Sequence, residues 1–402
     1  MLLKVVREGV YSSFTRLSRL LPLWKEAEAI TVIPPLLWKP VTPPVNHSHL
    51  PASFAAQFIR GKCIPARRIF LLKDVCISPD AVVFKNLKIF TPSLTWLRDL
   101  NTHRKGKLLL KQWRRKAGQV AGTETVALVF DQWSADNYYH WMVESLPRLL
   151  LVQEKYPDCL LLIPEPAPGY VRRTVSLLGF NRVLPLRRKT EEIVKVANLV
   201  LPELVYYYEE QEYINLFGTV RSEVADSGSF TEAGNGLQHQ ELIAVVRQKL
   251  LKGFAGTPVH AGRRIYVSRS RQKTRRLSNE QSIQPLLEKY GFETVYFEGM
   301  TFDEQVSLML ETEILLGVHG ANMVNILFLQ AGARVVEMMN KDHLNDAYYL
   351  MSSSIGLPYF SVPCAMADKS IHLTDDTVKL NDADLEVNVT QLEETLQLSV
   401  NH

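Results

Sequence analysis

The chain has 402 residues, of which 46% are hydrophobic and 22% charged, so it can bury two cores of ordinary size. A formal net charge of +4, without a zinc-finger or RNP-type motif, argues against a nucleic-acid partner. No apolar run approaches the roughly twenty residues of a membrane-spanning helix, and the N-terminus shows no signal-peptide pattern.

The N-terminal region is predicted to be an extension of the globular part, spanning residues 1–50. Residues 1–28 alternate basic side chains with leucines and valines, which is typical of an amphipathic helix. We expect this helix to pack on the protein, with a peripheral membrane contact as the alternative. A Pro-rich link over residues 34–51 and a short β region around residues 69–89 follow.

Alternating strands and helices begin at residue 125 and predict a doubly wound α/β half. The expected elements are strand 125–130, helix 138–155, strand 159–163, helix 170–178, and strands 182–186 and 194–201. A helix-like stretch over residues 213–224 precedes a polar, Gly- and Ser-containing run over residues 226–240. We place an interdomain boundary in that run, which gives an N-terminal domain over residues 51–230.

A second α/β set fills residues 231–402. Its expected elements are helix 242–251, strand 265–267, helix 280–289, strand 293–297, helix 302–311, strand 314–318, helix 321–329, strand 333–338, strand 359–362 and helix 390–399. The chain therefore reads as two Rossmann-like, doubly wound domains, and no internal repeat is recognisable.

The stretch LLGVHGANMVNILFLQAGARVVEM, residues 315–338, describes a strand, loop, helix and strand. Gly320 lets a ligand approach the backbone, and the helix that begins there points free N–H groups outward. An anion fits such a turn, although a glycine there is often no more than a tight turn.

Half of residues 263–276 are Arg or Lys, with no acid among them. Arg269, Arg271 and Lys273 come directly after the strand at residues 265–267, and open parallel sheets bind ligands where strands end. Guanidinium groups suit a diphosphate, whereas the alternative interpretation is a solvated surface.

His140 and Glu144 are four residues apart near the start of the helix at residues 138–155, which Asn137 is predicted to cap. An imidazole beside a carboxylate is what a general base requires, although an ordinary surface contact has the same spacing.

Together, NYYHWMVESLPRL, RRIYVSRSRQKTRRLSNE and the stretch around HGAN resemble glycosyltransferase family 61 in order and spacing, over about residues 125–363. The resemblance implies a GT-B-like enzyme with two domains facing a cleft, inversion at the anomeric carbon and no bound metal. It puts the base at Glu144, where several eukaryotic relatives have Asp, and His140 stays open as the alternative. It places Arg269 and Lys273 on the diphosphate of the sugar nucleotide, His319, Gly320, Ala321 and Asn322 in the turn over it, and Glu337 near the ribose.

We expect neither a metal nor a cofactor. The only Asp-x-Asp triplet, Asp382 to Asp384, lies in a polar stretch without a preceding strand and is interpreted as a solvated loop. The four cysteines form no CxxC pair, which favours a reducing compartment and hence the cytoplasm.

The sequence thus predicts an inverting, metal-independent transferase that moves a sugar from a nucleotide-sugar, expected to be a UDP-sugar, to a hydroxyl of a bacterial surface polysaccharide or a lipid-linked saccharide. The alternatives are another GT-B-like polysaccharide-modifying transferase and a catalytically silent glycan- or nucleotide-binding protein.

Overall fold

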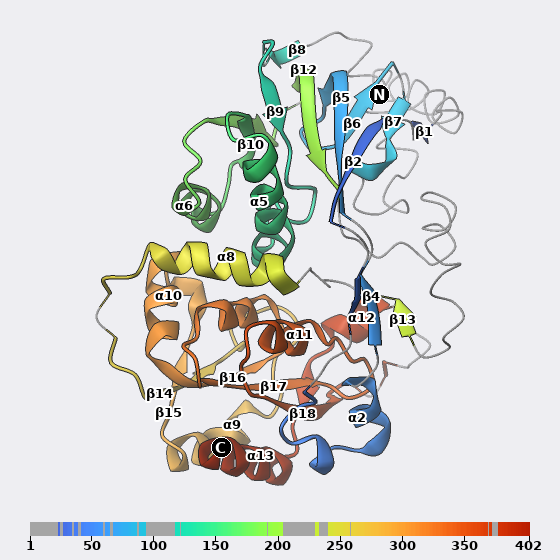
Figure 1. Ribbon diagram of the computed structural model, residues 1–402. Helices are drawn as coiled ribbons and strands as arrows, with labels where there is room; N and C mark the ends of the chain where they lie inside the picture. The colour runs from blue at the N-terminus through green and yellow to red at the C-terminus, as the bar shows by residue number, and fades with distance from the viewer. Residues whose placement is uncertain are drawn as a thin grey trace, which may run out of the picture. The chain divides into compact units, whose positions relative to one another are not determined.

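The computed structural model describes most of the chain, and every structural statement below concerns the described residues (Figure 1). They are residues 23–24, 27–33, 36–38, 42–58, 61–64, 67–86, 88–93, 117–120, 122–190, 192–203, 230–232, 240–257, 259–368, 370–371 and 377–402. Of the predicted helix at residues 1–28, only the end is described, and it contains the short strand β1, Leu23–Trp24. The predicted helix at 213–224 lies outside these residues, as does most of the boundary stretch at 226–240.

The chain divides into two compact units. Unit 1 comprises Met1–Leu36 and Pro65–Gly228, and unit 2 comprises Leu37–Ile64 and Ser229–His402. Residues 51–64, placed in the N-terminal domain by the sequence analysis, therefore group with unit 2.

Unit 1 contains a mixed sheet in the order β1-β7-β6-β5-β12-β9-β10-β11, to which β2 and β8 add at β5 and β12. The further strands of this sheet are β2 (Glu28–Ile33), β5 (Arg67–Ile77), β6 (Val83–Lys85), β7 (Lys88–Phe90), β8 (Ala117–Val120), β9 (Thr125–Ala127), β10 (Leu160–Glu165), β11 (Val183–Arg187) and β12 (Ile193–Pro202).

Only part of this sheet has the expected parallel arrangement. Strands β12, β9, β10 and β11 are parallel neighbours, whereas β12 is antiparallel to β5. Strand β5 continues into β6 and β7 through short antiparallel connections, one of which contains Asn86 at a left-handed φ of 46°. The short β region predicted around residues 69–89 is therefore present, and its strands are joined by tight turns that leave no room for crossover helices. The Rossmann-like domain predicted over residues 51–230 thus includes an antiparallel part.

The helices of unit 1 follow β9 and β10. They are α4 (Tyr138–His140), the π-helix η4 (Trp141–Ser145), α5 (Leu146–Lys155) and α6 (Gly169–Leu177), and a 3-10 turn, η2 (Thr91–Ser93), follows β7. Trp141 is fully buried, and its indole N–H donates to the hydroxyl of Thr174 in α6 at 2.9 Å. This bond ties the start of the long helix to α6.

Unit 2 contains a sheet in the order β15-β14-β16-β17-β18-β19. The strands are β14 (Arg263–Val267), β15 (Phe292–Val295), β16 (Thr312–Val318), β17 (Arg334–Asn340), β18 (Tyr359–Met366) and β19 (Leu385–Glu386). The first five are parallel, and β19 is antiparallel to β18. Numbered from β14, their order is 2-1-3-4-5, so the predicted doubly wound sheet is present in this unit.

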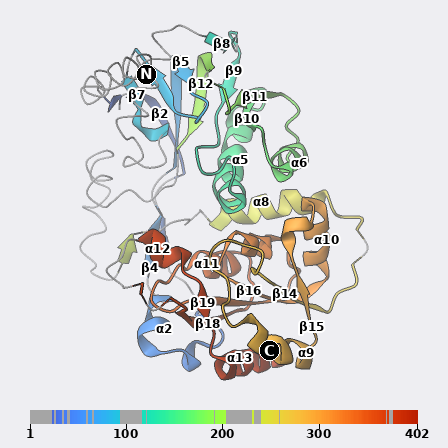
Figure 2. The same cartoon turned by 180° about the vertical axis from the view of Figure 1, so that it is seen from behind.

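Helices cover both faces of this sheet. One layer is α9 (Glu280–Lys289) and α13 (Val389–Asn401), and the other includes α8 (Gln240–Lys252), α10 (Phe302–Glu311) and α11 (Ala347–Ser354), as Figure 1 and the reverse view in Figure 2 show. A capping box at Thr301 and Glu304 starts α10. The smaller elements of unit 2 are η6 (Phe297–Gly299) and α12 (Thr377–Asp382).

The helix predicted after Gly320 is a 3-10 helix, η7, over Ala321–Phe328. A 3-10 helix rises about 2.0 Å per residue instead of 1.5 Å, so a short buried connection covers more of the sheet. Its last six residues are buried. The α-helix expected to begin at this turn is therefore absent from the described structure.

The segment before residue 65 completes unit 2. It contains β3 (Leu36–Trp38), η1 (His47–His49), α2 (Ala52–Phe58) and β4 (Gly61–Ile64), and β4 pairs with β13 (Phe230–Glu232). The buried Asn46 amide exchanges two hydrogen bonds with the backbone of Ser361 in β18, at 2.8 and 3.0 Å. These bonds hold the segment against the edge of the parallel sheet.

Candidate functional site

The long helix of unit 1 begins as predicted at Asn137. The side-chain Oδ1 of Asn137 accepts hydrogen bonds from the backbone N–H groups of Tyr139, at 3.0 Å, and His140, at 3.4 Å. Asn137 thereby satisfies two donors that the helix itself cannot pair.

The sequence predicted one uniform α-helix over residues 138–155, and the structure differs from that prediction. Between α4 and α5 it makes a π turn, in which the N–H of Leu146 donates to the carbonyl of Trp141, five residues earlier. Glu144 lies in this turn. Single π turns inside α-helices are frequent at functional sites.

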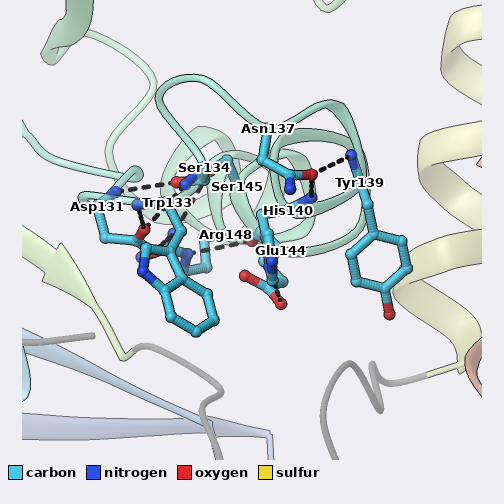
Figure 3. A network of polar contacts seen from close by, with 9 residues as sticks. All are labelled: Asp131, Trp133, Ser134, Asn137, Tyr139, His140, Glu144, Ser145 and Arg148. Carbon is cyan, nitrogen blue, oxygen red and sulfur yellow. Dashed lines mark hydrogen bonds and ion pairs between the residues drawn. The ribbon is translucent and has the colours of Figure 1, made fainter. Parts of the chain in front are cut away.

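The structure brings His140 and Glu144 together. The distance between Nδ1 of His140 and Oε1 of Glu144 is 2.9 Å, and Figure 3 shows the two side chains projecting from the same side of the helix. Glu144 is 2% exposed, and its Oε2 has no hydrogen-bond partner among the described residues. An unpaired buried carboxylate oxygen is costly unless it serves a ligand.

The buried cation Arg148 lies close to this pair. Nε of Arg148 donates to the backbone carbonyl of Glu144 at 3.1 Å, and its Nη2 lies 3.5 Å from Oδ2 of Asp131. Asp131 directly follows the apolar residues of the strand region, and both side chains are buried (Figure 3).

In unit 2, Arg269 lies just beyond the end of β14. Its side chain is buried, with Nε donating to the carbonyl of Arg275 at 3.1 Å and Nη2 to that of Thr274 at 3.2 Å. Burial, and to a smaller degree the positive charge of Arg275, lowers the pKa of Arg269 to about 10. A bound anion would offset both effects.

Gly320 lies beside this guanidinium. A β-carbon at Gly320 would come 2.1 Å from Nη1 of Arg269, so only glycine leaves room for the side chain. The close approach predicted for a ligand is made here by Arg269 itself. The glycine turn and the arginine-rich loop therefore form one site.

His319 is held by a buried carboxylate. Its Nδ1 lies 2.5 Å from Oε1 of Glu337, and Oε2 of Glu337 accepts a hydrogen bond from the hydroxyl of Tyr359 at 2.6 Å. Glu337 is 0% exposed. Each oxygen of Glu337 thus has a partner inside unit 2, and the carboxylate orients the His319 ring. The expected contact with ribose hydroxyls stays a prediction.

The remaining predicted donor residues differ in their surroundings. The guanidinium carbon of Arg271 lies 3.8 Å from the centre of the Tyr296 ring, whereas Lys273 is exposed. Ala321 and Asn322 form the start of η7, and Nδ2 of Asn322 is buried without a partner among the described residues. Asn322 thus offers a donor at the same turn.

Arg269 and His319 follow β14 and β16, which are neighbours in the sheet. The chain connects β14 first to β15, on one side, and later to β16, on the other, so the strand order reverses between β14 and β16. Ligands of open α/β sheets bind outside the carboxyl ends of the strands at such a reversal. The fold therefore places the cationic site where a ligand is expected.

Comparison with known proteins decides the family. Residues 138–336, about half of the chain, match the profile described as Glycosyltransferase 61. This segment belongs to glycosyltransferase family 61. The family predicted from the three motifs is thus confirmed.

Three curated relatives from animals are similar to parts of this chain. It is 31% identical to protein O-linked-mannose beta-1,4-N-acetylglucosaminyltransferase 2 of Canis lupus familiaris over 54% of the chain and 38% of the relative. The same protein of Mus musculus is 30% identical over 27% of the chain and 20% of the relative. The EGF domain-specific O-linked N-acetylglucosamine transferase of Drosophila melanogaster is 36% identical over 20% of the chain and 16% of the relative. The chain thus spans less than two fifths of each relative.

Two residues of the candidate site were missed by the sequence analysis, Tyr348 and His343. The hydroxyl of Tyr348 donates to the carbonyl of Gly320 at 2.7 Å, and its ring lies 5.0 Å from that of His319. Burial, and secondarily the nearby His319, lowers the pKa of His343. Both residues follow β17, the next parallel strand, and a search of every strand end would have found His343.

The Asp-x-Asp triplet is not a solvated loop. Asp384 accepts hydrogen bonds from the backbone N–H and the side chain of Arg276, at 2.7 to 3.0 Å, and Asp382 lies 3.5 Å from Arg275. These carboxylates anchor the arginine-rich loop. Within the part of the chain that the structure describes, no three acidic, His or Cys side chains are grouped to hold a metal ion, and no helix is long and apolar enough to cross a membrane.

Proposed function

We propose that this protein is an inverting, metal-independent glycosyltransferase that moves a sugar from a UDP-sugar to a hydroxyl of a glycan. The observation that carries the proposal is the cationic site at the strand-order reversal of unit 2, where Arg269, His319 and Asn322 meet in a segment of family 61. Such a site suits a diphosphate, which is the charged part of a sugar nucleotide.

Glu144 is the proposed base. Its Oε2 takes the proton of the acceptor hydroxyl while the acceptor oxygen attacks the anomeric carbon from the face opposite the diphosphate. The new carbon–oxygen bond forms as the bond to the diphosphate breaks, and the electron pair leaves with the nucleoside diphosphate. His140 stays the alternative base. Its contact with Oε1 of Glu144 otherwise fixes the carboxylate's orientation.

The leaving diphosphate gains negative charge in this step. The guanidinium of Arg269, the imidazole of His319 and the amide of Asn322 provide fixed donors for that charge, which is the role that a divalent cation has in metal-dependent transferases. The proposal includes the GT-B-like fold that the family resemblance implies, with the base supplied by unit 1 and the donor site by unit 2.

The names of the relatives favour one donor. All three are N-acetylglucosaminyltransferases by name, so UDP-N-acetylglucosamine is the first donor to test. The acceptor class is proposed to be a surface polysaccharide or lipid-linked saccharide. The bacterial origin expected from the sequence stays a prediction, because these relatives come from animals. The free thiols of Cys76, Cys159 and Cys364 suit the proposed cytoplasmic setting.

The test is a donor panel. The purified chain is incubated with UDP-, GDP- and dTDP-sugars in the presence of EDTA, and release of nucleotide is measured with and without simple saccharide acceptors. We expect release from a UDP-sugar, with UDP bound beside Arg269 and His319 in a soaked crystal. Binding of UDP elsewhere, or release that requires a metal, would contradict the proposal, and binding without turnover would favour the silent binding protein.

A further inference from the structure

The helix that carries Glu144 changes from a π turn to an α-helix at Leu146, and the next two residues are Pro147 and Arg148. We propose that Pro147 and Arg148 are positioning residues, which create and hold the π turn so that the Glu144 carboxylate faces the acceptor hydroxyl. This inference rests on the proposed function, in which Glu144 is the base.

Pro147 accounts for the turn. In a regular α-helix its N–H would donate to the carbonyl of Val143, but proline has no N–H and its ring clashes with that carbonyl. Widening the helix by one residue before the proline removes the clash. The observed bond from Leu146 to Trp141 is this wider turn. Pro147 thus favours a π turn at the position of Glu144.

Arg148 closes the widened turn. Its Nε donates to the backbone carbonyl of Glu144 at 3.1 Å, and its Nη2 lies 3.4 Å from the hydroxyl of Ser145. The side chain of Arg148 is 3% exposed, so these bonds face little competition from water. Arg148 therefore fixes the backbone of the residue that bears the proposed base.

Asp131 anchors Arg148 to the end of the preceding strand region. Its Oδ1 accepts from the backbone N–H groups of Trp133, at 2.7 Å, and Ser134, at 3.0 Å, while Oδ2 lies 3.5 Å from Nη2 of Arg148. Asp131 thereby links the π turn to the loop that follows β9 (Figure 3). A loose turn would let Glu144 swing away from His140.

The π turn at Pro147 and the hydrogen bonds of Arg148 have a common consequence for the proposed base. A buried base contributes to the rate only while its oxygen is in line with the acceptor proton, and a displacement of about 1 Å costs on the order of 100-fold. Pro147 has no polar side-chain group, and Arg148 contacts the turn through the backbone carbonyl of Glu144 and the hydroxyl of Ser145. Both are therefore placed to act by positioning Glu144.

The decisive variant is Pro147→Ala, which restores the missing N–H donor. We expect kcat with the wild-type donor, tested first as UDP-N-acetylglucosamine, to fall about 10- to 100-fold. The melting temperature should stay equal or rise, because a helix interior gains a hydrogen bond. The matched control is Pro285→Ala, the same change inside α9, which should leave kcat unchanged. Arg148→Lys keeps the charge but not the planar donor group, and should lower kcat without a matching change in KM.

The outcomes separate the two hypotheses. Crystal structures of Pro147→Ala and Arg148→Lys show whether the π turn persists, and this readout needs no activity. A π turn that persists in both variants, or a Pro147→Ala protein with wild-type kcat, overturns the positioning role. A wild-type protein that turns over no sugar nucleotide overturns the proposed function, while a regular α-helix in Pro147→Ala would still assign the turn to the proline.

Discussion

The guanidinium of Arg269 lies against the backbone of Gly320, about fifty residues later in the chain. A β-carbon at Gly320 would stand 2.1 Å from Nη1 and 2.6 Å from Cζ of Arg269. Position 320 therefore requires glycine because Arg269 occupies the space that a larger side chain would fill. The absence of a side chain at Gly320 lets a buried cation reach the turn that carries His319.

Gly320→Ala should displace Arg269. Since the clashing atoms are the end of a flexible side chain, the free energy of unfolding should fall only by about 1 kcal/mol, at the low end for overpacking. Affinity for UDP should fall about tenfold, the loss expected when one charge-assisted hydrogen bond is weakened. Calorimetry with UDP measures the affinity and urea unfolding the stability. Gly299→Ala, with no atom near the added carbon, is the control. Equal UDP affinity in both variants would contradict this account.

Glu144→Gln and His140→Asn should separate the two candidate bases. Loss of a general base lowers kcat by about 100- to 10,000-fold, and we expect that loss for Glu144→Gln. His140→Asn removes only the contact with Oε1 and should cost less. UDP affinity should stay unchanged in both, because the residues belong to unit 1. A larger loss for His140→Asn than for Glu144→Gln would make His140 the base.

The parallel sheet of unit 2 was predictable because each of its buried strands is a short apolar run between polar turns. The mixed sheet of unit 1 was not, since β5 and β12 pair antiparallel across more than a hundred residues. No local pattern specifies that pairing. The π turn was missed because an apolar stripe fits both helix types, although Pro147 inside the predicted helix was a signal that the ladder must break there.

The candidate site was also only partly predictable from the sequence. The motifs identified Arg269, His319 and Gly320, and the structure places them together. Their partners were not visible, because Tyr348 and Tyr359 come from other elements and look like ordinary core aromatics. Glu337 was assigned to the ribose because it matches an acid of the family motif. Its burial against His319 depends on packing that a single strand pattern does not contain.

Glu337→Gln should weaken both the fold and the donor site. The amide keeps the size of the carboxylate but cannot accept from both His319 and Tyr359 with full charge. We expect a loss of about 1–3 kcal/mol in the free energy of unfolding and a weaker affinity for UDP. Tyr359→Phe removes only the Oε2 bond and should lower stability while leaving UDP binding closer to wild type. Identical UDP affinities for wild type and Glu337→Gln would exclude an orienting role for the carboxylate.

His343 should make unit 2 sensitive to acid. Burial, with a smaller contribution from His319, lowers the pKa of His343 below the usual 6.5. Above that pH the imidazole is neutral in both states. As the pH falls below 6.5, the unfolded chain binds the proton first, so stability is lost, by at most about 1.4 kcal/mol per pH unit. In His343→Asn the decline in unfolding free energy between pH 7.5 and 5.5 should be smaller. A parallel decline in both proteins would show that His343 is not responsible.

Arg269→Lys retains a positive charge at the end of β14 but loses the fork that binds the carbonyls of Thr274 and Arg275. Because a lysine ammonium is a compact point charge, it cannot hold these carbonyls and a diphosphate in the same geometry. We expect UDP affinity to fall at least about tenfold, with a smaller loss for uridine, which lacks phosphates. Arg276→Lys changes an exposed arginine paired with Asp384 and serves as the control. An equal loss of affinity for uridine and for UDP in Arg269→Lys would show that the cation does not act on the diphosphate. The donor site would then have to lie away from the strand-order reversal.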